Sequence, residues 1–149
     1  MKKVLIFSFL LAVLGGSVAC KKDVDQDKLI NDYLTKKGWT AEKTPEGVYY
    51  IIDVQGTGST TTPTPSNTVT VKYKGYLLDE TVFDANQTTG ITYPLRNLIT
   101  GWQIGLAKFK KGGKGKLLIP SAYGYGASGS DSIPGNAPLV FEIELVDFK

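Results

Sequence analysis

The chain has 149 residues, 42% hydrophobic and 21% charged, a composition typical of one globular domain, and it contains no histidine and one cysteine. Those counts exclude Ser-His-Asp and Cys-His nucleophiles, histidine general bases and zinc sites made of clustered His and Cys. The formal net charge of +3 falls to +1 when Lys2 and Lys3 are set aside with the first nineteen residues, so a nucleic acid partner is not expected.

Residues 1–19 have the pattern of a secretory signal peptide. Lys2 and Lys3 form a short basic region, residues 4–14 carry no charge, and residues 15–19 are mostly small. The apolar stretch is too short, and wrongly flanked, for a stable transmembrane helix. We therefore predict removal of residues 1–19 and leave them out of the fold.

The single cysteine follows directly. Ser17-Val18-Ala19-Cys20 resembles a bacterial lipoprotein processing site, in which Cys20 is acylated and becomes the first mature residue. The alternative is an ordinary signal peptide followed by an unpaired thiol. We predict the lipid anchor, because an odd cysteine in an exported protein needs an explanation and acylation requires no further partner. The protein is then expected at a membrane of the bacterial envelope, facing the periplasm or the exterior.

Residues 20–44 are predicted to form a lipid-anchored tether that includes a short helix. The segment 21–27 is charged and poor in apolar residues. Helical spacing then relates Leu29, Ile30, Tyr33 and Leu34, and Gly38 is a suitable stop, which predicts a helix over 26–37. This helix could pack on the chain's own domain, mediate dimerisation or do neither, and we favour packing on the domain.

Residues 45–149 are predicted to form one domain rich in β-strands. Alternating apolar and polar residues predict strands over 48–54, 69–74, 115–119 and 139–148. One face of the last strand carries Leu139, Phe141, Ile143 and Leu145, and Glu142 and Glu144 lie on the other. Residues 56–67, rich in Thr, Gly and Pro, read as a surface loop.

A helix is predicted over residues 96–109, where the alternation breaks down. Leu98, Trp102, Leu106 and Phe109 fall on one helical stripe. Gly101 and Gly105 lie beside this stripe, and each costs a helix about 1 kcal/mol relative to alanine, so we expect a sheet to approach the helix backbone closely there. The predicted fold is α+β, a twisted antiparallel sheet of about five strands wrapped around one short helix, with a second short helix at the N-terminus.

Seven short motifs follow one another between residues 47 and 148. They are Val71-Lys72-Tyr73-Lys74-Gly75, Val82-Phe83-Asp84, Leu98-Ile99-Thr100-Gly101-Trp102, Ile119-Pro120, Tyr123-Gly124-Tyr125-Gly126, Ile133-Pro134 and Leu139-Val140-Phe141-Glu142. No motif is specific alone, but their order and approximate spacing resemble the FKBP-type peptidyl-prolyl cis-trans isomerases. The resemblance implies an FKBP-like fold and an enzyme without cofactor or metal that accelerates rotation of X-Pro bonds. Because such rotation breaks no covalent bond, the lack of histidine is compatible with it.

The same resemblance implies a cup that holds a prolyl ring. Trp102 would be its floor. The walls would be Tyr73, Phe83, Leu98, Ile99 and Phe141, with Tyr93 as a further aromatic and Ile133 closing the far side. Without the resemblance, Tyr73, Leu98 and Phe141 would be assigned to the hydrophobic core.

Three polar groups are also implied by the resemblance. The hydroxyl of Tyr125 would bond a substrate carbonyl, and the backbone N–H of Ile99 would be a second donor to the bound peptide. Asp84 would orient the peptide at the rim and bias the electric field at the twisting amide. On its residue type alone, Asp84 could equally be a turn residue at the end of a strand.

The chain departs from the family pattern at several positions. Ile91 occupies a place where many members have a second pocket aromatic, which argues against tight binding of the macrolide inhibitors that the resemblance implies. Glu80 replaces a glycine that is common in the family in the turn before Val82. The loop over 127–132 is about one residue shorter than in the small cytosolic members of the family.

Three functions remain open from the sequence. The first is an active isomerase, tethered to the membrane through Cys20, that acts on proline-containing exported proteins. The second is a chaperone or adaptor that binds proline-containing segments with little turnover. The third and weakest is a surface-displayed lipoprotein that uses its exposed strands for interaction.

Overall fold

The computed structural model describes residues 25–149, so the predicted signal peptide and Cys20 lie outside the described residues. The elements in order are α1 (Gln26–Lys37), β1 (Glu42–Lys43), β2 (Tyr49–Val54), β3 (Thr68–Leu77), β4 (Val82–Pro94), the 3₁₀ turn η1 (Leu95–Asn97), α2 (Thr100–Leu106), β5 (Gly113–Ile119), the 3₁₀ turn η2 (Ser121–Tyr123) and β6 (Leu139–Phe148). Across residues 25–149, no helix combines the length and apolar character that crossing a membrane requires.

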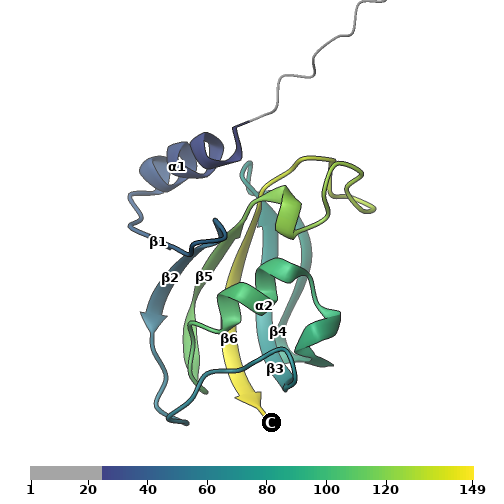
Figure 1. Ribbon diagram of the computed structural model, residues 1–149. Coiled ribbons are helices and arrows are strands. Elements are labelled where there is room, and N and C mark those ends of the chain that lie inside the picture. The colour runs from purple at the N-terminus through teal and green to yellow at the C-terminus, as the bar shows by residue number, and fades with distance from the viewer. Residues whose placement is uncertain (1–24) are drawn as a thin grey trace, which may run out of the picture.

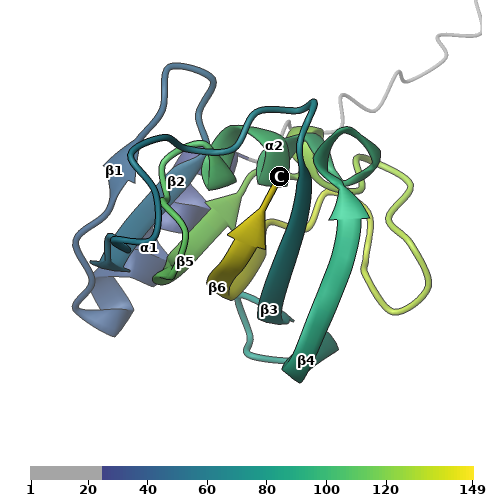
Figure 2. The same cartoon turned by 90° about the horizontal axis from the view of Figure 1, so that it is seen from below.

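The strands form one antiparallel sheet in the order β1-β2-β5-β6-β3-β4. The sheet curves, and α2 lies on its inner side (Figures 1 and 2). This confirms the predicted α+β fold. The sixth strand is β1, in which Glu42 pairs with Tyr50 and Lys43 with Tyr49. The sheet therefore begins ahead of Pro45, the residue at which the domain was predicted to start.

Each face of the sheet is apolar where a helix packs on it, and the rest of the outer face is charged, with pairs such as Lys114–Glu144 and Lys116–Asp53. On the inner face, Phe109, Leu117 and Leu145 are fully buried in the main core around α2. On the outer face, α1 contributes Ile30, Tyr33 and Leu34, which pack with Tyr49, Tyr76, Leu118 and Val140 of the sheet. The prediction that the N-terminal helix packs on its own domain is confirmed.

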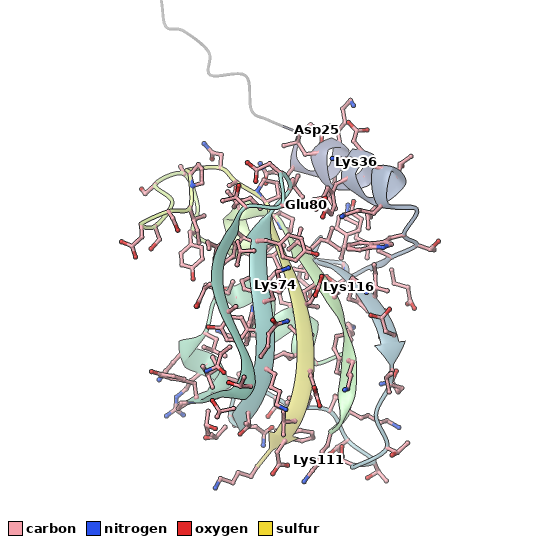
Figure 3. The ribbon with its side chains drawn as sticks, turned by 180° about the vertical axis from the view of Figure 1, so that it is seen from behind. Asp25, Lys36, Lys74, Glu80, Lys111 and Lys116 are labelled. Carbon is pink, nitrogen blue, oxygen red and sulfur yellow. The ribbon has the colours of Figure 1, made fainter. Side chains whose placement is uncertain are left out.

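Helix α1 begins and ends at the predicted residues. The carboxylate of Asp25 accepts a hydrogen bond from the Lys28 N–H and caps its start, and Gly38 adopts a left-handed conformation (φ 66°) that ends it. From behind, Figure 3 shows α1 across the upper part of the outer face, with Lys74 and Lys116 below it. Lys37 pairs with Glu80 in the β3–β4 turn at 2.7 Å.

Strand β4 is the element that the sequence pattern revealed least. It is an edge strand of 13 residues, and most of its side chains are exposed or half-buried. Its register shifts, because Val71 pairs with Ile91 whereas Tyr73 pairs with Asn86. The residues of β4 between these two pairs bulge from the sheet. Apolar and polar residues therefore do not alternate regularly along this part of the sequence.

The helix predicted over 96–109 is shorter and interrupted. Leu98 and Ile99 are extended between η1 and α2, with ψ values of 163° and 146°. The side-chain amide of Gln103 donates to the Leu98 carbonyl at 2.9 Å, which holds this extended turn against the helix. Gly101 and Gly105 do allow the close approach that we predicted, since Cβ atoms there would lie 2.3 Å from Ile119 and 2.5 Å from Leu117 of β5.

Candidate functional site

A hollow of about 170 Å³ lies beside α2 and is bounded by β3, β4, β6 and the loop that follows η2. Its lining consists of Tyr73, Phe83, Asp84, Ile91, Leu98, Ile99, Trp102, Tyr125 and Phe141. All the residues predicted for the prolyl cup and its polar rim are in this lining except Tyr93 and Ile133. The fold thus brings together side chains from six separate segments of the chain.

The base of the hollow is an aromatic cluster. The Trp102 ring lies 5.2 Å from Tyr73 and 5.3 Å from Phe141 between centroids, with interplanar angles of 82° and 90°. Phe83 packs on Phe141 in the same edge-to-face manner at 5.5 Å. Such edge-to-face packing fixes the rings in orientation. The result is a rigid apolar surface of a size that suits a small ring.

Trp102 and Phe141 are the most enclosed of these residues. Trp102 is 3% exposed, and its indole Nε1 has no hydrogen-bond partner within residues 25–149. Its backbone N–H donates to the Ile99 carbonyl at 2.9 Å. The first turn of α2 therefore ties the floor of the hollow to the extended residues Leu98 and Ile99 on its wall.

The backbone N–H of Ile99 is free to bind a ligand. Ile99 is half-buried and precedes the first turn of α2, and within residues 25–149 its N–H donates to no protein acceptor. A half-buried donor without a protein partner is available to a carbonyl of a bound peptide.

The polar side of the hollow is formed by Asp84 and two phenols. The hydroxyl of Tyr73 donates to Oδ2 of Asp84 at 2.5 Å, which orients the exposed carboxylate at the rim. Burial, then the hydrogen bond to Asp84, raises the pKa of Tyr73 well above its usual value. Burial and the negative charge of Asp84 likewise raise the pKa of Tyr125. Both phenols therefore remain protonated donors at neutral pH.

Tyr125 lies in the loop between η2 and β6 and is 38% exposed. It shares a second hollow of about 180 Å³ with Phe83, Asp84, Ser130, Asp131, Ser132 and Ile133. Ile133 itself is only 8% exposed and belongs to the core cluster, so it borders this adjoining hollow and not the aromatic one. The two hollows meet at Phe83, Asp84 and Tyr125.

Tyr93 does not line the hollow, contrary to the prediction. It is 53% exposed near the end of β4, opposite Val69, whereas Ile91 two residues earlier lines the hollow and pairs with Val71. The two residues share one face of the strand. Only Ile91, which is nearer to Phe83 and Asp84 at the start of β4, reaches the hollow. One signal for this was present in the sequence, because the family resemblance places a pocket aromatic of many members at Ile91.

The comparisons with known proteins agree with this geometry. The family model described as "FKBP-type peptidyl-prolyl cis-trans isomerase" matches residues 59–146. The chain is 43% identical over 132 residues to the FKBP-type peptidyl-prolyl cis-trans isomerase FkpA of Buchnera aphidicola (Schizaphis graminum), covering 87% of this chain and 51% of that protein. It is 43% identical over 104 residues to FkpA of Escherichia coli K12, covering 68% and 37%. The chain thus spans about half or less of the length of these two curated relatives.

Solved structures are similar over most of the chain. The crystal structure of FkpA from Escherichia coli gives a TM-score of 0.75 at 37% identity, covering 87% of this chain and 62% of that one. A peptidyl-prolyl cis-trans isomerase from Pseudomonas syringae gives 0.71 at 30% identity, covering 83% and 93%. Since the family model covers more than half of the 149 residues, the chain belongs to the FKBP-type peptidyl-prolyl cis-trans isomerase family.

Proposed function

We propose that the protein is an active prolyl isomerase that accelerates rotation about X-Pro bonds of exported polypeptides. The observation that carries this proposal is the aromatic hollow beside α2, which occurs within the segment that matches the family. The hollow holds the prolyl ring, and the bond that precedes the ring lies at the rim, among Asp84, Tyr125 and the Ile99 N–H.

Rotation is slow in water because the amide loses its resonance when it twists. The barrier is about 18–20 kcal/mol, and uncatalysed isomerisation takes tens to hundreds of seconds. The planar amide is more charge-separated than the twisted one, so a site poor in water favours the twisted form over the planar form. Each 1.36 kcal/mol of that preference increases the rate tenfold.

The residues have distinct roles in this scheme. Trp102 is the floor under the ring, and Tyr73, Phe83, Ile91, Leu98 and Phe141 exclude water from its sides. The Tyr125 hydroxyl and the Ile99 N–H bind carbonyl oxygens of the peptide. Asp84 sets the orientation of the peptide and the local electric field, and Tyr73 acts through Asp84 by holding its carboxylate.

We further propose that Cys20 carries a lipid and that the domain works at a membrane of the bacterial envelope, on the periplasmic or outer side. The support is the sequence around Cys20 together with the signal-like segment before it. A macrolide inhibitor would compete for the same hollow, with affinity reduced because Ile91 replaces an aromatic wall.

The test is a proline-limited peptide isomerisation assay with the chain from Lys21 onward, which retains every described residue. Asp84→Asn and Tyr125→Phe are each expected to lower kcat/KM about tenfold, the effect of losing one charge-assisted or buried hydrogen bond. Trp102→Ala is expected to lower it further, with circular dichroism as the check on its fold. Matched controls are Asp53→Asn and Tyr50→Phe, which alter an exposed ion pair and an exposed hydrogen bond on β2.

Acceleration by the parent, with losses confined to the hollow variants, would support the isomerase. If a well-folded parent gave no acceleration but bound proline-containing peptides through Trp102, the chaperone or adaptor function would replace it. A parent with neither property would leave only an interaction through exposed strands.

A further inference from the structure

The side chain of Gln26, the first residue of α1, contacts both ends of the loop that carries Tyr125. Its Oε1 accepts a hydrogen bond from the Ser121 N–H at 3.1 Å, and its Nε2 donates to the Asn136 carbonyl at 3.0 Å. The contacts span 95 and 110 positions in the sequence. Figure 3 shows the start of α1, marked by Asp25, as the end of the helix nearest that loop.

These two bonds close a ring of four hydrogen bonds. The Ser121 carbonyl accepts from the Gly126 N–H at 2.8 Å, and the Gly126 carbonyl accepts from the Asn136 N–H at 2.9 Å. Gln26 joins Asn136 back to Ser121. Within the ring each of the four residues donates one bond and accepts one, and the Ser121 carbonyl also accepts from the Gly124 N–H at 3.0 Å. Tyr125 directly precedes Gly126, a member of the ring.

The other hydrogen bonds of the loop are internal to it, among them the Gly129 N–H to the Tyr125 carbonyl at 3.1 Å, and Ile133 anchors its middle in the core. Between η2 and β6 the loop contains no helix or strand beyond a single bridge of Ser130 with Ile133. Ser121 is 6% exposed, so its N–H needs a protein acceptor, and Gln26 supplies one. The Asp25 cap fixes the first turn of α1, and the apolar face of the helix is buried on the sheet. Gln26 therefore presents its amide from a firmly placed element.

We infer that Gln26 is a positioning residue that holds the Tyr125 loop in register with the aromatic hollow. The effect on turnover rests on the function proposed above, whereas the effect on the loop does not. Helix α1 thus supports the binding site through Gln26 without lining it.

A primary amide is the group that this position requires. It offers an N–H donor to the Asn136 carbonyl and an acceptor to the Ser121 N–H. An ionised carboxylate of the same shape keeps the acceptor, loses the donor, and places a negative charge against a carbonyl oxygen. A carboxylic acid in its protonated form again has one donor and one acceptor.

The test is therefore Gln26→Glu in the chain from Lys21 onward. An acid in the first helical turn suits α1, so the substitution leaves the helix intact. At neutral pH, amide hydrogen exchange at Gly126 and Asn136 is expected to rise about five- to tenfold, while the Leu118 amide in β5 stays at the parent value. The kcat/KM is expected to fall about three- to tenfold. The matched control is Lys28→Gln, on the same helix, which removes only an exposed pair with Asp32.

Acidification supplies a second readout. Below the pKa of the introduced carboxyl, about 4.3 or higher where the ring favours the protonated form, loop protection relative to the parent should return. A purely structural defect in α1 would not recover in this way.

The inference is overturned if Gln26→Glu leaves the exchange of Gly126 and Asn136 at the parent value, whatever happens to turnover. It is equally overturned if exchange rises but acid does not restore it. Should the parent itself show no turnover, the proposed function fails, and the exchange measurements still decide the role of Gln26.

Discussion

Gly75 leaves open the space that the Phe83 ring fills. A Cβ atom on Gly75 would lie 2.6 Å from Cε2 of Phe83 and 2.7 Å from Cε1 of Phe141. Gly75 pairs with Asp84 on β4 and with Phe141 on β6. The walls of the aromatic hollow therefore close over a strand position that has no side chain.

Replacing Gly75 with alanine is expected to push both rings out of place. We predict that Gly75→Ala lowers the free energy of unfolding by about 1–3 kcal/mol, as for other overpacked cores, and reduces kcat/KM at the same time. Denaturant unfolding and the isomerisation assay measure the two effects. Lys72→Ala, on the opposite face of the same strand, is the control and should change neither by much. A fully active Gly75→Ala protein would contradict this account.

The Tyr73 hydroxyl should matter for turnover more than for stability. Tyr73→Phe retains the ring against Trp102 but removes the hydrogen bond to Asp84. Because the Asp84 carboxylate is exposed and water can replace the bond, we expect stability to change by about 1 kcal/mol or less and kcat/KM to fall about three- to tenfold. Combining Tyr73→Phe with Asp84→Asn should cost little more than Asp84→Asn alone. Additive losses would show that the phenol acts independently of the carboxylate.

The buried phenols predict a loss of stability at high pH. Burial raises the pKa of Tyr33, Tyr73, Tyr76 and Tyr125 in the folded chain. The unfolded chain releases these protons near pH 10, so their contribution to stability is complete below about pH 10 and is lost as the pH rises above it. We expect the free energy of unfolding to decline steadily above pH 10, and less steeply in Tyr76→Phe.

This measurement is made in about 1 M salt, which screens the surface ion pairs. An unfolding free energy that stays constant up to pH 11.5 would show that folding does not raise the pKa values of these phenols.

Glu80 holds a backbone conformation that favours glycine. Its φ is 73°, and its carboxylate pairs with Lys37 at 2.7 Å. Glu80→Gly and Glu80→Gln both remove the ion pair, but only the glycine removes the left-handed strain. We therefore expect Glu80→Gly to be more stable than Glu80→Gln by roughly 0.5–1 kcal/mol in denaturant unfolding. Equal stability would mean that the turn relaxes without strain.

The periodic elements could be predicted from the sequence because one face of each is buried. The stripe from Leu29 to Leu34, with Gly38 as its stop, predicts the bounds of α1, and packing on the domain is the favoured one of three alternatives. The glycines at 101 and 105 predict the close approach of a sheet, which is made by β5. The edge strand β4 could not be predicted, since exposure and a bulge remove its alternation. The break at Leu98 and Ile99 depends on the Gln103 side chain, which no propensity reveals.

The functional site likewise has a part that the sequence predicts and a part that it does not. The family motifs predict eight of the nine lining residues, and the ninth is Ile91, at which the resemblance indicates only a departure from a pocket aromatic. Tyr93 matches the family by residue type, but only the position along β4 distinguishes it from Ile91, which lines the hollow. The contact of Gln26 with Ser121 and Asn136 joins residues about a hundred positions apart, and nothing in a single sequence indicates it.

Helix α2, which carries Trp102, has seven residues, well below the roughly 12–15 at which an isolated helix becomes even marginally stable in water. It persists because β5 packs on it, and β5 is itself held between β2 and β6. The hollow consequently has no partly formed precursor, and a chain that has not completed its sheet cannot capture a proline. The domain then becomes able to bind proline in the same cooperative transition in which it folds. The fluorescence of Trp102 would follow this transition in a Trp39→Phe background.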